Sequence, residues 1–136
     1  MNFNMQPHQL NAQIEPQFLE VNQFIINHLG SNVPLVEKIG HYIVKSGGKR
    51  FRPLLVLLAA NACQKNLEGN DHIKLASVIE FIHTATLLHD DVVDGSDLRR
   101  GKDTANAKWG NAPSVLVGDF LYSRAFQVMV EIGKLE

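Results

Sequence analysis

One long segment, from about residue 73 to residue 94, constrains the fold of this 136-residue chain more than any other feature. When its residues are placed at about 100° per position, the acidic side chains from Glu80 onward and His83 gather on a strip about 120° wide, and mainly apolar side chains fill the remaining arc. Leu87 interrupts the strip, and His89 lies on the apolar side. The polar strip consists of Glu80, His83, Asp90, Asp91 and Asp94. Surface helices normally show the opposite proportions, with a narrow apolar stripe. The pattern therefore predicts a helix that is packed by its neighbours on most sides, with one acidic strip left open.

The rest of the sequence predicts an all-α fold with about five helices. Apolar residues recur at three- and four-residue steps, and prolines and glycines mark the ends of the periodic segments. The other expected helices cover residues 16–29, 34–46, 54–63, and 113 to near the end of the chain. Residues 96–111 lack apolar periodicity, which predicts a loop with at most one short turn, and no strand pair is expected. Residues 1–15 are predicted to form a flexible polar arm, and residues 16–136 a single helical domain.

Charge and cysteine content exclude several classes of protein. The chain has 13 Lys and Arg against 14 Asp and Glu, a net charge of -1, which argues against binding nucleic acid through an overall basic field. Cys63 is the single cysteine, so an internal disulfide is excluded and a reducing compartment is indicated. No apolar run approaches the ~20 residues that span a bilayer, and the first residues lack the pattern of a signal peptide. We therefore expect a cytoplasmic protein with no nucleic-acid partner.

Three aspartates at the end of the long segment form a candidate metal site. Asp90 and Asp94 are one helical turn apart on the same face, and Asp91 flanks them. Carboxylates this close repel one another, and the helix C-terminus is the unfavourable end for anions. A bound cation would offset both costs, and hard oxygen ligands favour Mg²⁺, which is typically held by one or two carboxylates and substrate phosphates. The alternative, a solvated acidic helix end, fits less well with a helix that is otherwise so apolar.

Two basic clusters flank these acids in the sequence. Residues 47–53, GGKRFRP, place Lys49, Arg50 and Arg52 just before an expected helix, whose N-terminus favours phosphate. This is not a Walker loop, because the G-x-x-x-x-G-K-[ST] spacing is absent, and a solvated basic turn is the plainer alternative. The second cluster, residues 99–102, follows the acids after one loop. Acids that bind a metal beside arginines that bind phosphate predict a metal–diphosphate clamp.

His83 lies on the same polar strip as the acids. It precedes Asp90 by seven residues, about 10.5 Å along a helix. From that position it could donate a hydrogen bond to a second phosphate group, although a helical histidine is more often structural.

Together these residues resemble the trans-isoprenyl diphosphate synthases, and in particular the long-chain, octaprenyl-type polyprenyl synthases. The matching motifs are GGKRFRP at residues 47–53, EFIHTATLLHDDVVDGSDLRRGK at 80–102 and VLVGDFLYSRAF at 115–126. The resemblance extends from about residue 18 to the end. It implies an isoprenoid-synthase-type helical bundle that condenses isopentenyl diphosphate head-to-tail with an allylic diphosphate. The implied product is a long-chain all-trans polyprenyl diphosphate, a precursor of quinone side chains.

The resemblance also implies a role for each matched residue. Asp90 and Asp94 would hold Mg²⁺ that bridges the allylic diphosphate, with Asp91 supporting them, and Arg99 would contact the same diphosphate. The residues that would hold isopentenyl diphosphate are Lys49, Arg52, His83 and Arg100.

Product length in the family depends on side-chain bulk just before the first aspartates. Ala85 and Thr86 are small at this position, where an aromatic side chain would block the elongation tunnel. This implies a long product, and any membrane contact is expected to be peripheral and limited to product release.

The sequence departs from the family pattern in one respect. Family members are more than twice as long and carry a second aspartate-rich motif, which this sequence lacks. We therefore expect the chain to represent the N-terminal part of such an enzyme, with one half of a two-sided metal site and negligible synthase activity by itself. Apolar faces on residues 54–63 and 115–132 are expected to drive self-association, with a homodimer as the expected form.

Other functional classes fit the sequence less well than a polyprenyl synthase. A non-catalytic partner subunit of a heteromeric synthase would not need the complete set of acids and arginines. A terpene cyclase or another D-D-x-x-D enzyme would not need the GGKR loop, which serves a second diphosphate. A simple nucleic-acid or phosphate-binding module would bind in a salt-sensitive manner with no requirement for Mg²⁺.

Overall fold

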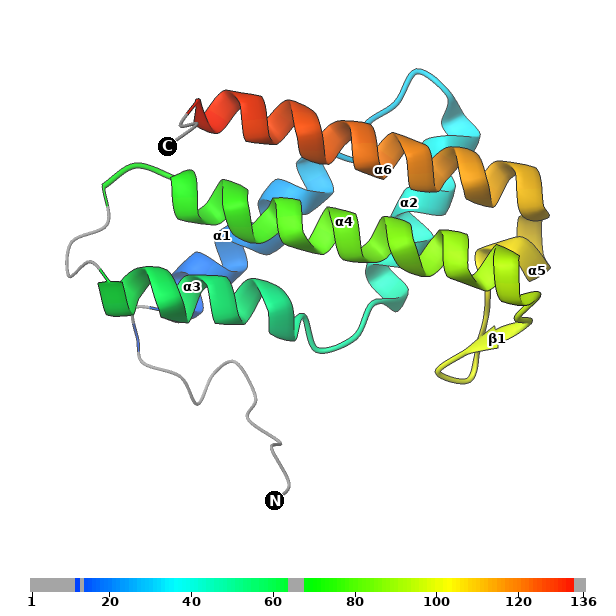
Figure 1. Cartoon of the computed structure of the whole chain (residues 1–136), viewed down its shortest axis with the longest axis horizontal. Coiled ribbons are helices and arrows are strands. Elements are labelled where there is room, and N and C mark those ends of the chain that lie inside the picture. Colours follow the sequence, from blue (N-terminus) through cyan, green and yellow to red (C-terminus); the bar gives the residue numbers. More distant parts are fainter. Residues whose placement is uncertain (1–11, 13, 64–67, 134–136) are drawn as a thin grey trace.

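The computed structural model describes residue 12 and residues 14–63 and 68–133, and in these residues the chain is almost entirely helical (Figure 1). The helices are α1 (Ile14–Asn27), α2 (Pro34–Ser46), α3 (Phe51–Cys63), α4 (Asp71–Asp94), α5 (Ala105–Trp109) and α6 (Asn111–Ile132). Two short strands, β1 (Leu98–Arg99) and β2 (Lys102–Asp103), pair antiparallel. The all-α prediction is confirmed. Most of the predicted arm lies outside the described residues, and α1 includes residues 14 and 15.

The prediction of a loop without strands over residues 96–111 is wrong. This segment contains the β1–β2 hairpin and a sixth helix, α5, which Thr104 caps by accepting a hydrogen bond from the backbone N–H of Ala107 at 3.2 Å. Two-residue strands and a five-residue helix are too short to produce a recognisable periodicity. They are specified by individual turn and capping residues.

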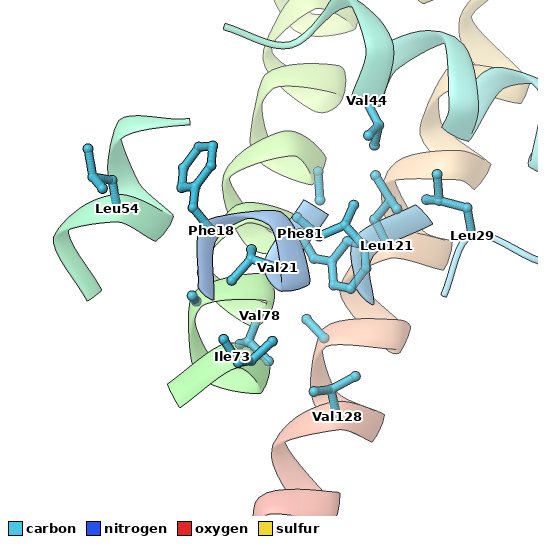
Figure 2. Packing of buried hydrophobic residues seen from close by; sticks show 14 of the residues in the cluster. Phe18, Val21, Leu29, Val44, Leu54, Ile73, Val78, Phe81, Leu121 and Val128 are labelled. Carbon is cyan, nitrogen blue, oxygen red and sulfur yellow. The ribbon is translucent and has the colours of Figure 1, made fainter. Parts of the chain in front are cut away.

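Helix α4 lies at the centre of the bundle and packs against α1, α3 and α6 (Figure 1). Helix α6 runs antiparallel along it. Phe81, in the middle of α4, is fully buried in the same cluster as Val21 of α1 and Leu121 of α6 (Figure 2). The prediction of a central, mostly covered helix is therefore confirmed, with two exceptions. Leu75 and Val93 were expected on the packed arc but are 44% and 83% exposed, because no described neighbour covers the two ends of the helix on that side.

The C-terminal end of α4 leads directly into the hairpin. Gly95 adopts a left-handed conformation (φ 61°), and its N–H contacts the carbonyl oxygens of Asp91 and Val92. The next N–H, from Ser96, also donates to the Asp91 carbonyl, at 2.9 Å. This is the predicted glycine stop, and it turns the chain back beside its own helix.

Two findings concern the surface of the described residues. Among the described helices, none is both long enough and apolar enough to cross a lipid bilayer. Cys63 is a free, exposed thiol at the end of α3.

A close contact between His89 of α4 and Gly118 of α6 generates a stability prediction. The His89 ring lies 3.2 Å from the Val115 carbonyl and 3.4 Å from the Asp119 carboxylate, and a Cβ on Gly118 would come within 2.2 Å of its Nε2 atom. Gly118→Ala must displace this ring, so we expect a double-mutant cycle with His89→Ala to give a coupling energy of about 1–2 kcal/mol. Urea unfolding at constant pH measures it.

The cycle is needed because alanine also favours a helix interior over glycine by about 1 kcal/mol. Gly40→Ala in α2 provides a matched control inside a helix, since a Cβ there meets only Leu29 Cδ2 at 3.5 Å, an ordinary van der Waals distance. Simple additivity of Gly118→Ala and His89→Ala would show that the contact is not a packing constraint.

Candidate active site

The two outer aspartates of the acidic strip are open to solvent. Asp90 and Asp94 are both exposed near the end of α4, and neither forms an ion pair within the part of the chain that the structure describes. The described residues contain no group of three or more His, Cys, Asp or Glu side chains that is already arranged to hold a metal ion. Two carboxylates one turn apart still fit Mg²⁺, because this ion is usually held by one or two carboxylates and keeps its remaining positions for water and substrate phosphate.

Asp91 has a different environment from its neighbours. Its side chain is nearly buried, and its two oxygens accept hydrogen bonds from Nε and Nη2 of Arg99 at 2.9 and 2.7 Å. The pKa of Arg99 is raised, chiefly by this hydrogen bond, which outweighs the opposing effect of burial. A forked pair of this kind is among the stronger protein ion pairs. Asp91 is therefore occupied by an arginine, whereas Asp90 and Asp94 face outward.

The hairpin sends two consecutive arginines to different places. Its two-residue turn, Arg100 and Gly101, has φ values of 52° and 76°, which is the type I′ geometry that matches the twist of paired strands. Thr104 closes the base by donating from its Oγ1 to the Ser96 carbonyl at 2.7 Å. Arg99 thus reaches back to Asp91 on α4, while Arg100 extends across to the loop before α3.

Arg100 rests against a glycine of that loop. A Cβ built on Gly48 would lie 1.6 Å from Nη1 of Arg100, so only glycine leaves room for the guanidinium. Gly48, the second of the two glycines before Lys49, therefore has a steric reason: it lets a cation from a distant loop approach the backbone.

The side chains predicted to bind isopentenyl diphosphate line one cavity of about 380 Å³, which Arg99 does not line. Its lining consists of Gly48, Lys49, Arg50, Phe51, Arg52, Glu80, His83 and Arg100. All four residues predicted to hold the second diphosphate are in this set, although they come from the loop before α3, from α3, from α4 and from the hairpin. We call it the basic cavity.

His83 is neutral in the basic cavity. Its Nε2 lies 3.1 Å from Nη1 of Arg52, and because a guanidinium can only donate, Nε2 must accept and the ring proton must sit on Nδ1. Burial lowers the pKa of His83, and the positive charges of Arg52, Arg100 and Arg99 lower it further. The ring can therefore donate from Nδ1 at neutral pH.

Two charged residues of the cavity, Arg50 and Glu80, were not among the residues predicted to hold a diphosphate. Arg50 has a left-handed backbone (φ 49°) and turns inward, donating to Oδ1 of Asn22 on α1 and to the Val44 carbonyl of α2. Burial raises the pKa of Glu80, while the charges of Arg50 and two other arginines oppose that shift. Through its two hydrogen bonds, Arg50 ties the loop before α3 to α1 and α2. The sequence signals were its place among the cations and the place of Glu80 on the polar strip, but neither signal specifies a partner.

The two predicted chain-length residues face different ways. Ala85 is completely buried in the hydrophobic core, whereas Thr86 is half-buried on the side nearer the acidic strip, with its hydroxyl donating to the His83 carbonyl at 2.7 Å. Neither lines the basic cavity.

Comparison with known proteins gives a consistent result. A profile of the polyprenyl synthetase family matches residues 33–136. The octaprenyl diphosphate synthase of Escherichia coli (strain K12) is 60% identical over 116 residues, covering 85% of this chain and 35% of that protein. The chain thus spans about a third of the length of such relatives.

Solved structures agree with this match. The decaprenyl diphosphate synthase from Rhodobacter capsulatus superposes with a TM-score of 0.87 and 43% identity, covering 94% of this chain and 39% of that one. A polyprenyl synthase from Caulobacter crescentus CB15, complexed with calcium and isoprenyl diphosphate, gives a TM-score of 0.85 and 47% identity over 90% of this chain and 37% of that one.

The environment of His83 predicts a pH effect. Its folded pKa lies below the ordinary 6.5, so the unfolded chain binds more protons between the two values, and the free energy of unfolding falls as pH drops through that interval. Arg52→Gln removes both a neighbouring charge and the donor to Nε2, so it should raise the titration midpoint of His83, measured by NMR of the imidazole ring. Arg124→Gln, an equal charge change on α6, should leave the midpoint in place. An unmoved midpoint in Arg52→Gln would contradict the assigned tautomer and contact.

Proposed function

The chain belongs to the polyprenyl synthetase family, and on that premise we propose that it carries diphosphate-binding machinery of a long-chain prenyltransferase. The reaction joins isopentenyl diphosphate to an allylic diphosphate: the allylic C–O bond breaks, a carbon–carbon bond forms, and diphosphate and a proton are released. The observation that carries the proposal is the arrangement along α4. Two exposed carboxylates, Asp90 and Asp94, lie at its end, and His83 lies two turns earlier in the basic cavity.

The acidic end of α4 would hold the allylic diphosphate through Mg²⁺. When bound, Mg²⁺ would neutralise charge on the departing diphosphate. Asp90 and Asp94 would supply its protein ligands, and Arg99, fixed in place by Asp91, presents its charge beside them. The Caulobacter crescentus relative, whose structure contains calcium and isoprenyl diphosphate, supports a divalent cation here.

The basic cavity would hold isopentenyl diphosphate directly. Lys49, Arg52 and Arg100 supply positive charge, and neutral His83 supplies the Nδ1 hydrogen. These donors come from rigid or tethered segments, so little reorganisation is needed when an anion binds. Two diphosphates would thereby be held beside α4, one through a metal and one without.

An apolar groove supports a long product. It lies between α3, α4 and α6, near the opposite end of α4 from the aspartates, and has a volume of about 870 Å³. Its lining includes Val56, Leu75, Phe126, Met129 and Val130. We place the growing isoprenoid chain along α4 in this direction. The exposed Leu116 and Phe126 of α6 also support association of two copies through an apolar face.

Metal dependence tests the proposed allylic site. With inorganic pyrophosphate as the probe, Mg²⁺ should add a binding event in calorimetry that Asp90→Asn or Asp94→Asn weakens by about tenfold or more, because each removes a metal ligand. Asp97→Asn, the same charge change at an exposed loop position, should retain it. Binding that ignores Mg²⁺ and both variants would favour a simple phosphate-binding module.

Product length tests the position of Thr86. In a chimera where this chain replaces the matching segment of the Escherichia coli relative, Thr86→Phe should shorten the main product, because the ring enters the proposed path of the chain. Thr86→Val, of similar volume, should leave the length unchanged. Ala85→Phe should instead lower the melting temperature, since its site is fully buried and overpacking costs about 1–3 kcal/mol. Unaltered products from Thr86→Phe would place the path elsewhere.

A further inference from the structure

Asp91 and Arg99 point to a link between the two diphosphate sites. We propose that the Asp91–Arg99 ion pair is a positioning pair that sets Arg100 in the basic cavity, so that one carboxylate of the acidic strip serves the metal-free site. This rests on the proposed function, in which the basic cavity binds a diphosphate. Asp91 is then a positioning residue for the second substrate, distinct from its two exposed neighbours.

Asp91 accepts hydrogen bonds through both its side chain and its backbone carbonyl. Its carboxylate oxygens accept the two hydrogen bonds from Arg99, and its backbone carbonyl accepts from Ser96 at 2.9 Å. Its side chain is only 8% exposed. One residue of α4 therefore fixes the start of the connection and the first strand of the hairpin together.

The hairpin transmits this position over a short distance. Arg99 pairs with Lys102 across two strands of two residues each, and Arg100, the first residue of the turn, directly follows Arg99 in the chain. The base of the hairpin is held separately, by Thr104 Oγ1 at 2.7 Å and Asn106 Nδ2 at 2.9 Å from the Ser96 carbonyl. The second strand is held to α2, because the hydroxyl of Tyr42 donates to the Asp103 carbonyl at 3.0 Å. Arg99 holds the first strand to α4, and it is the residue that Arg100 directly follows.

Arg100 must arrive accurately. Its guanidinium occupies the space where a Cβ on Gly48 would lie, and it forms one wall of the basic cavity beside Arg52 and His83. A cation that reaches a diphosphate from a separate loop loses its charge-assisted hydrogen bond when displaced by about an ångström.

The direction of the change in anion affinity distinguishes positioning of Arg100 from a simple electrostatic effect of Asp91. Asp91→Asn removes a negative charge close to an anion site, which by Coulomb's law should strengthen anion binding. If Asp91 acts by positioning Arg100, the same substitution should weaken it. Arg99→Lys leaves the net charge unchanged but cannot form the fork, so it should weaken binding in the same direction.

The experiment measures pyrophosphate binding to the full 136-residue chain by calorimetry in the presence of EDTA, so that the metal site does not contribute. We expect Asp91→Asn and Arg99→Lys each to lower the affinity by about tenfold, the loss of one charge-assisted hydrogen bond. Asp97→Asn, a matched charge change at an exposed residue of the same connection, should stay within about twofold of wild type. Far-UV circular dichroism and the melting temperature identify any variant that fails to fold.

Gly48→Ala displaces Arg100 directly and provides a variant outside the ion pair. It should weaken binding to a similar extent, and adding Asp91→Asn to it should cost little more, because both changes act through the same guanidinium. Wild-type affinity in folded Asp91→Asn, or full additivity with Gly48→Ala, would overturn the inference. No metal-free binding by the wild-type chain would instead overturn the proposed isopentenyl diphosphate site.

Discussion

Burial of α4 on most of its circumference is the constraint on which the rest of the structure depends. Apolar contacts with α1, α3 and α6 hold its rotation and position, so the polar strip that remains has a fixed direction. Phe81 lies inside the core one residue from Glu80 and two from His83. A site built on such a helix gains precision, because the packing that stabilises the fold also sets where each polar side chain points.

Opposite charges meet along this strip in two different ways. At the acidic end, Asp91 and Arg99 neutralise one another in a forked pair, whereas Asp90 and Asp94 are exposed and form no ion pair within the described residues. In the basic cavity, Glu80 partly offsets the surrounding arginines without forming an ion pair within the described residues. Internal counter-charges thus lie beside both groups of like charge.

Periodicity predicted the long helices and the polar strip, since these follow from spacing along one segment. It could not predict the partner of Asp91, because Arg99 reaches it through a hairpin whose strands are two residues long. Periodicity placed Ala85 on the packed arc, where the structure buries it completely, whereas the resemblance gave Ala85 and Thr86 the same chain-length role. The four basic-cavity residues were predicted from motif and resemblance, whereas the reason for Gly48 emerged only when a distant guanidinium was found against it.

The backbone of Arg100 has an evolutionary consequence. A left-handed conformation at the first turn position suits asparagine or glycine, and a long side chain there costs about 1 kcal/mol or more. Selection for thermal stability alone would favour asparagine or glycine at this turn position, and the positive charge of Arg100 would be lost. The turn at Arg100 therefore marks a trade-off, in which the molecule gives up some folding stability so that this arginine can reach the loop before α3.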